Sequence, residues 1–133
     1  MRIDPHLTFR GDCEAAFRVY ERLFGGKLML LTYGASPAAT TVPADWHDKI
    51  AHATLGFADG HALLGADVLG DHFERPQGFY VLAALRDADE AQRTFDALAD
   101  GGSVKMPLQK TFWSASFGVV VDRFGTAWEI TVE

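Results

Sequence analysis

The sequence contains one cysteine, Cys13, so it cannot form a disulfide bond within the chain. It has no apolar run long enough to span a membrane, and its lysines and arginines form no cluster. A net charge of −6 argues against nucleic-acid partners, which need a basic protein face. The first residues also lack the apolar core of a signal peptide. We therefore expect a cytoplasmic protein that binds neither nucleic acid nor membranes.

The most informative feature that is present is an internal repeat. Residues 12–26, DCEAAFRVYERLFGG, align with residues 87–101, DADEAQRTFDALADG. Aspartate begins both segments, glycine ends both, and aromatic and apolar positions match between them. Two copies are too few for a solenoid, which needs three or more repeats to bury a core. The repeat instead predicts two similar modules in one domain.

Each copy of the repeat is a predicted helix between predicted strands. The first helix carries an apolar stripe at i, i+3 and i+4 spacing, with Asp12 as its N-cap and two glycines at its end. The second should begin at Asp87 and bury Ala88 among its apolar residues. Period-two alternation predicts strands at 2–10, 27–33, 50–57, 61–67, 79–85, 103–106, 114–121 and 126–132. Residues 1–133 thus form a single α+β domain, with βαβββ modules at about 1–67 and 79–133 that share one curled mixed sheet around a pocket.

Three segments make the chain resemble the vicinal oxygen chelate superfamily, the glyoxalase/bleomycin resistance/dioxygenase group, and within it the PhnB-like branch. They are PHLTFRGDCEAAFRVYERLFGG at 5–26, KIAHATLGFADG at 49–60 and MPLQKTFWSASFGVVVDRFGTAWEI at 106–130. The resemblance covers nearly the whole chain outside the loops 34–49 and 68–78. It implies paired βαβββ modules curled around a pocket, in a homodimer that binds a small organic ligand.

The resemblance also implies a divalent-metal site with one ligand from each of four strands. The first of these positions falls on Pro5, beside His6, and the second on Leu64 or Gly65. The third falls on Tyr80 and the fourth on Glu129, so only Glu129 is kept. A bulge near Pro5 would place His6 at the first position.

A methyltransferase activity is sometimes attributed to this branch, and the glycine pattern argues against it. A nucleotide-type donor site requires a glycine-rich turn that leads from a strand into a helix. The doublets Gly25-Gly26 and Gly101-Gly102 follow predicted helices instead, where glycine ends a helix.

Strand alternation predicts which side chains face away from the helices. These positions are His6, Thr8, His52, Thr54, Glu129 and Thr131. Glu129 is the best catalytic candidate, because a carboxylate among apolar neighbours is costly to bury unless it is paired, metal-bound or protonated. The alternative is a carboxylate that is hydrogen-bonded or wetted. His6 and His52 are candidates for a metal or for structural hydrogen bonds.

An aromatic segment supplies the predicted ligand contacts. Trp113 and Phe117 offer apolar surface beside polar groups, as small-molecule sites do, although they could equally fill the core or a dimer interface. Tyr80 joins them by analogy between the modules. Cys13 lies at the first turn of a helix, which can activate a thiol, but burial in the apolar stripe is the alternative.

These observations predict a small-molecule-binding protein, with His52 and Glu129 orienting the ligand. One alternative is a metal-dependent lyase, isomerase or dioxygenase in which His6, His52 and Glu129 hold a divalent cation as Lewis acid. Another is a metal-free enzyme with Glu129 as the base. The sequence does not identify the ligand.

Overall fold

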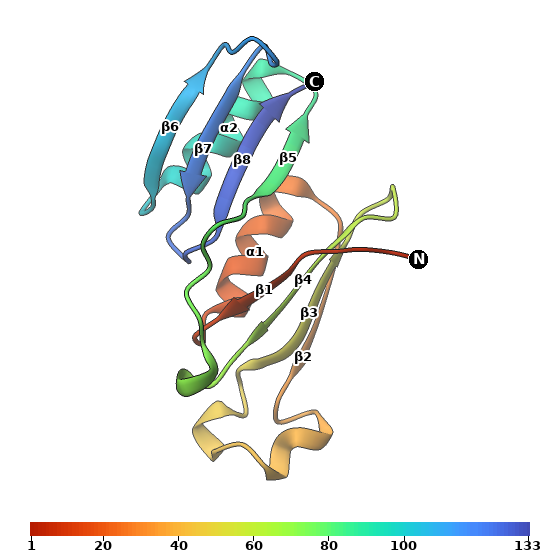
Figure 1. Cartoon of the computed structure of the whole chain (residues 1–133). Helices are drawn as coiled ribbons and strands as arrows, with labels where there is room; N and C mark the ends of the chain where they lie inside the picture. The colour runs from red at the N-terminus through yellow and green to blue at the C-terminus, as the bar shows by residue number, and fades with distance from the viewer. The chain divides into compact units, whose positions relative to one another are not determined.

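The computed structural model describes residues 1–133, which divide into two compact units, Met1–Glu74 and Arg75–Glu133. Each unit contains one βαβββ module (Figure 1). The elements of the first are β1 (His6–Phe9), α1 (Cys13–Phe24), β2 (Lys27–Thr32), β3 (Ile50–Gly56) and β4 (Ala62–Asp67). Those of the second are β5 (Val81–Leu85), α2 (Ala88–Ala99), β6 (Ser103–Gln109), β7 (Phe117–Val121) and β8 (Ala127–Val132).

The two modules have the same topology, which confirms the internal repeat. Their strand orders are β1-β4-β3-β2 and β5-β8-β7-β6. In both, the first strand pairs in parallel with the last, and the other pairings are antiparallel. The helices α1 and α2 each have 12 residues. The protein is therefore α+β with paired βαβββ modules, and its strands form one four-stranded sheet per module instead of the expected shared sheet.

One face of each sheet packs against the helix of its module, and the other face is left open by that helix. The alternation predicted this division in the first unit, where Leu7, Phe9, Ala53 and Leu55 are buried. In the second unit, Trp128 and Ile130 are buried as the alternation predicts, whereas Val132, also expected in the core, is half-buried. The predicted open positions are exposed or half-buried, so the period-two pattern assigned the faces correctly.

The two helices begin in different ways. The carboxylate of Asp87 accepts a hydrogen bond from the Glu90 backbone N–H at 2.8 Å, as predicted for an N-cap. Asp12 makes no such capping bond. Instead Asp67, at the end of β4, accepts hydrogen bonds from the N–H groups of Gly11 and Cys13, both at 2.9 Å. The prediction that the side chain of Asp12 caps α1 was therefore wrong, and the carboxylate that binds backbone N–H groups at the start of α1 is that of Asp67.

Two details of the second unit also differ from expectation. Ala88 is exposed, whereas Thr94, which the predicted stripe did not include, is buried. Strand β6 runs past Pro107, which we expected to end it. Proline is tolerated there because β6 lies at the edge of the sheet, and the β6–β7 register shifts between Met106 and Gln109.

The segments 34–49 and 68–78 connect strands without long regular elements. They contain three short 3₁₀ turns, Pro37–Thr40, Ala44–Trp46 and Gly70–His72. Tyr33 holds the base of the first segment, because its hydroxyl donates to the backbone oxygen of Asp67 at 2.6 Å and its ring meets Trp46 edge-on. Neither helix is long and apolar enough to cross a membrane.

Candidate functional site

Strand register defines a row of side chains across the open face of the first sheet. His6 on β1 is paired with Leu64 on β4, which is paired with Thr54 on β3, which is paired with Met29 on β2. Paired residues point to the same face of a sheet, so this row combines an imidazole and a hydroxyl with two apolar side chains.

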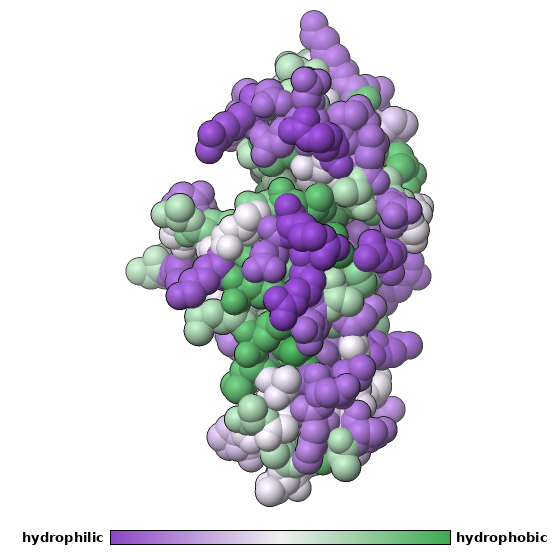
Figure 2. All heavy atoms as spheres, turned by 180° about the vertical axis from the view of Figure 1, so that it is seen from behind, coloured by the Kyte–Doolittle hydropathy of each residue, from purple (hydrophilic) through white to green (hydrophobic).

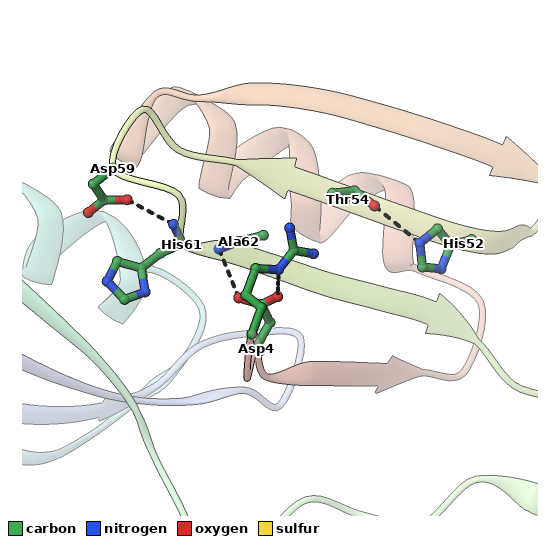
Figure 3. Close-up of polar contacts among 7 residues, drawn as sticks. Asp4, His52, Thr54, Asp59, His61 and Ala62 are labelled. Atoms are coloured by element: carbon green, nitrogen blue, oxygen red, sulfur yellow. Dashed lines mark hydrogen bonds and ion pairs between the residues drawn. The ribbon is translucent and has the colours of Figure 1, made fainter.

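His52 lies two residues before Thr54 on β3 and therefore on the same face. Its ring centroid is 6.4 Å from that of His6, with 34° between the ring planes. Its Nε2 is 3.1 Å from the hydroxyl of Thr54 (Figure 3). The structure thus brings together the two histidines that the sequence singled out in this module.

The surroundings of His6, including His52, shift its titration. Partial burial lowers the pKa of His6 below its ordinary value of 6.5, and the nearby His52 lowers that pKa further. Both effects disfavour a charged imidazole at His6. At neutral pH the ring of His6 is therefore available as a hydrogen-bonding or metal-binding nitrogen.

The register shows which side chain at the start of β1 lies on the open face of the sheet. The β1–β4 pairing runs from His6 to Phe9 without a register shift, so no bulge is needed to place His6 on the open face. Pro5 precedes the strand, and its backbone oxygen accepts a hydrogen bond from Leu64. The imidazole of His6 thus lies on the open face, as the alternation predicted, while its role as a metal ligand stays a prediction.

The second position implied by the family resemblance does not fit a metal. Leu64 lies on the open face but has no ligand atom, and a Cβ on Gly65 would lie 2.5 Å from the ring of Phe17 on the covered face. No group of three or more His, Cys, Asp or Glu side chains is arranged to hold a metal ion. The residues of the first unit therefore provide two imidazole ligands and no family-type set of four.

The second sheet has a corresponding row on its open face. Leu82 on β5, Glu129 on β8, Val119 on β7 and Met106 on β6 are paired in register. Leu82 is 55% exposed, and Glu129 is half-buried between it and Val119. The Glu129 carboxylate thus lies at an open apolar surface and not in a closed core.

Aromatic side chains gather beside this row. The rings of Trp113 and Phe117 meet edge-on with their centroids 5.2 Å apart, and the rings of Phe112 and Trp113 meet edge-on with their centroids 4.6 Å apart. Trp113 is 56% exposed, whereas Phe117 is buried. The structure therefore joins two of the three predicted ligand-contact residues, while Tyr80 lies just before β5 and is 50% exposed.

The aromatic segment is held by the hydroxyl of Ser114, which the sequence analysis did not single out. This hydroxyl donates to the backbone oxygen of Ser116 at 2.7 Å and is 2.8 Å from the hydroxyl of Thr131 on β8. Fixing the backbone beside Trp113 reduces the entropy that the ring would lose on binding a ligand.

Two buried carboxylates also escaped the sequence analysis. Asp67 is 1% exposed, and its oxygens accept from Gly11, Cys13 and Ile50 N–H groups, each at 2.9 Å. Asp122 accepts from the indole Nε1 of Trp128 at 3.0 Å and shapes the turn before β8. Asp67 could have been found, because it continues the covered-face parity of Leu63 and Gly65 on β4.

Cys13 is a buried core residue whose thiol is not activated. The residue is fully buried, and burial raises the pKa of its thiol, with the charges of Asp67, Asp12 and Glu14 raising that pKa further. A raised thiol pKa removes the reactive thiolate. The helix position that favours activation is therefore outweighed by burial and neighbouring carboxylates.

Residues 2–130 match the family described as the Glyoxalase/Bleomycin resistance protein/Dioxygenase superfamily. The chain belongs to this superfamily. It is 32% identical to Protein YjdN of Escherichia coli (strain K12), over 99% of this chain and 95% of that protein. It is 43% identical to protein PA1353 from Pseudomonas aeruginosa, with a TM-score of 0.87, over 100% of this chain and 98% of that one.

The structural neighbours of this superfamily member include a PhnB protein. It comes from Bacillus cereus and is described as a putative 3-demethylubiquinone-9 3-methyltransferase. The two chains share 21% identity with a TM-score of 0.81, and each is covered completely. This likeness shows the fold alone. In the present chain both glycine doublets follow helices, at the ends of α1 and α2, as the sequence predicted.

Proposed function

We propose that this member of the superfamily is a small-molecule-binding protein of the glyoxalase/bleomycin-resistance type, PhnB-like in kind. The observation that carries the proposal is the open face of each sheet, where apolar side chains surround a few polar groups. Small-molecule sites commonly have this composition. On the second sheet, Trp113 and Phe117 contact the apolar part of the ligand, together with Tyr80.

The polar groups orient the ligand in this proposal. Glu129 accepts hydrogen bonds from ligand donors on the second sheet, and its half-buried position between Leu82 and Val119 strengthens such bonds. His52 offers a ring nitrogen on the first sheet, where Thr54 steadies the imidazole. Lone polar groups on apolar surfaces fix orientation more than they add affinity.

A ligand screen by thermal shift tests the proposal, because a ligand that binds only the folded state raises the melting temperature. Trp113→Ala should weaken binding of each hit by about 10-fold, with a loss of about 1.4 kcal/mol. Trp46→Phe serves as the matched control, since Trp46 packs on Tyr33 in the first unit. Equal affinities for wild type and Trp113→Ala would remove the aromatic site.

We also propose that the protein is a homodimer. Large apolar side chains are unusually exposed in the single chain, and Figure 2 shows apolar atoms at the surface among hydrophilic ones. Those on the open sheet faces include Met29, Leu31 and Leu82. Leu82→Glu should shift the mass measured by light scattering from dimer to monomer, and Gln92→Glu on the exposed side of α2 should leave it unchanged.

A second candidate function, catalysis, is favoured by one observation. The Glu129 carboxylate is accessible yet flanked by apolar side chains, an environment suited to a general base or a metal ligand. Any turnover found with a ligand should be abolished by Glu129→Gln if this carboxylate acts as base or essential ligand. Unchanged turnover in that variant would exclude both roles.

We also propose that the protein is cytoplasmic. Its one cysteine, Cys13, is buried and forms no disulfide, as is usual for proteins of a reducing compartment.

A further inference from the structure

Glu129 is the one charged residue on the two central strands of the second sheet, β8 and β7, and no basic side chain pairs with it. The ion pairs of the structure lie elsewhere, one between Arg2 and Asp4 and two on α1. The other charged residue in the strands of this sheet is Lys105 on β6, which is two strands away from β8. The Glu129 carboxylate can therefore accept a charged partner from outside the protein.

The surroundings of this carboxylate are apolar. Leu82 flanks it on β5 and Val119 flanks it on β7. The open face on which they lie is turned toward the viewer in Figure 1, with α2 behind the sheet. A half-buried carboxylate among apolar side chains attracts an opposite charge more strongly than a carboxylate in water does. The same surroundings make a second negative charge unfavourable there, so this face favours positively charged molecules over negatively charged ones.

We propose that the second sheet binds organic cations, in which an ammonium group pairs with Glu129 and an apolar body lies against the neighbouring aromatic side chains. This inference rests on the proposed small-molecule function and specifies the charge of the ligand. An ammonium group needs only one carboxylate. A metal ion takes several ligands, and Glu129 is the only Asp, Glu, His or Cys in strands β5 to β8. The donor set of this sheet therefore fits an ammonium group.

Strand register places aromatic surface next to the ammonium position. Phe117 is paired with Thr131, which lies two residues after Glu129 on β8 and therefore on the same face. The ring of Trp113 meets that of Phe117 edge-on with their centroids 5.2 Å apart, and Trp113 is 56% exposed. Two residues span about 7 Å along a strand, so a short apolar chain connects the ammonium position with this aromatic surface.

The first sheet offers no equivalent site. The one acidic residue in its strands is Asp67, which is buried and accepts three backbone hydrogen bonds. The polar side chains on its open face include His6 and His52, and neither imidazole carries a negative charge. We therefore expect one ammonium group to bind per chain, at Glu129.

Three probes of similar size and different charge test the proposal. They are phenethylamine as the cation, phenethyl alcohol as the neutral molecule and hydrocinnamate as the anion. Binding to the full-length protein is measured at neutral pH by NMR, through the indole N–H signal of Trp113, which is assigned by its loss in Trp113→Phe. We expect the amine to bind about 10-fold more tightly than the alcohol, because hydrogen bonds to charged groups are the stronger ones, and the anion to bind most weakly.

Two substitutions at Glu129 change the charge of the site. Glu129→Gln keeps the shape and an accepting oxygen, so it should weaken amine binding by about 10-fold and leave alcohol binding unchanged. Glu129→Lys should reverse the order, with hydrocinnamate binding more tightly than the amine. Asp89→Asn is the matched control, because it removes the same charge from an exposed position on α2 and should leave all three affinities unchanged. Circular dichroism and melting curves establish that each variant is folded.

Four results would overturn the proposal. They are no amine binding by the wild-type protein at millimolar concentration, alcohol binding as tight as amine binding, amine binding that is unchanged in Glu129→Gln, and amine binding that Asp89→Asn weakens equally. Equal binding of the amine and the alcohol would remove only the charge preference and would support the broader small-molecule function. The thermal-shift screen decides that broader function separately, because its hits need not carry a charge.

Discussion

Asp67→Asn should destabilise the protein strongly although it changes only one oxygen into an amide nitrogen. The carboxylate of Asp67 is buried and accepts three backbone hydrogen bonds of 2.9 Å. Asparagine can keep the bonds from Gly11 and Cys13 through its oxygen. Its NH₂ group then faces the N–H of Ile50, where two donors meet without an acceptor. The variant loses one charge-assisted hydrogen bond and leaves a buried donor unsatisfied.

The expected cost is about 3 kcal/mol in the free energy of unfolding, since hydrogen bonds to charged groups contribute roughly 1.5–3 kcal/mol each. A domain of this size should lose roughly 10 °C in melting temperature. Urea denaturation followed by circular dichroism measures the free energy, and Asp45→Asn, at an exposed position, is the control. A loss below about 0.5 kcal/mol would refute the view that Asp67 ties β4 to α1 and β3.

Three further predictions follow from the first unit. Gly65→Ala should lower the free energy of unfolding by about 1–3 kcal/mol, because the new Cβ would lie 2.5 Å from the buried ring of Phe17. Gly56→Ala is the control, since a Cβ there meets nothing within 4 Å. Equal unfolding midpoints for the two variants would contradict this prediction. Cys13 should not react with a thiol reagent at neutral pH until the protein unfolds, given its burial and raised pKa; rapid labelling of native protein would show that the core around Cys13 opens in the folded state. His6 should titrate below 6.5 by NMR, and His52→Gln should raise its pKa towards that value. The pKa of His6 is lower in the folded protein than in the unfolded chain, so its contribution to stability is present above pH 6.5 and is lost as the pH falls below 6.5 through the folded-state pKa. A titration midpoint of His6 above 6.5 in the folded protein would reverse the direction of this pH dependence.

Much of the site was predictable because strand periodicity is a local property. Alternation alone placed His6, His52 and Glu129 on the faces opposite the helices, and the register confirms these assignments. Family-based counting pointed to Pro5 as the first ligand position, whereas the side chain that lies on the open face at this end of β1 is His6. Local pattern was the better guide because a sheet face depends on parity, which a count anchored at a distant glycine does not preserve.

The sequence by itself determined the two modules, their helices and which side chains of the strands His6–Phe9, Ile50–Gly56 and Ala127–Val132 face away from the helices. These features depend on residues close together in the chain, through the repeat at 12–26 and 87–101 and through hydrophobic periodicity. Only the tertiary structure decided which distant groups meet. Asp67 replaces Asp12 at the start of α1, and His52 comes within reach of His6 across β4. Such contacts depend on strand order and register, which are set by packing of the whole module and leave no signal in the neighbouring sequence.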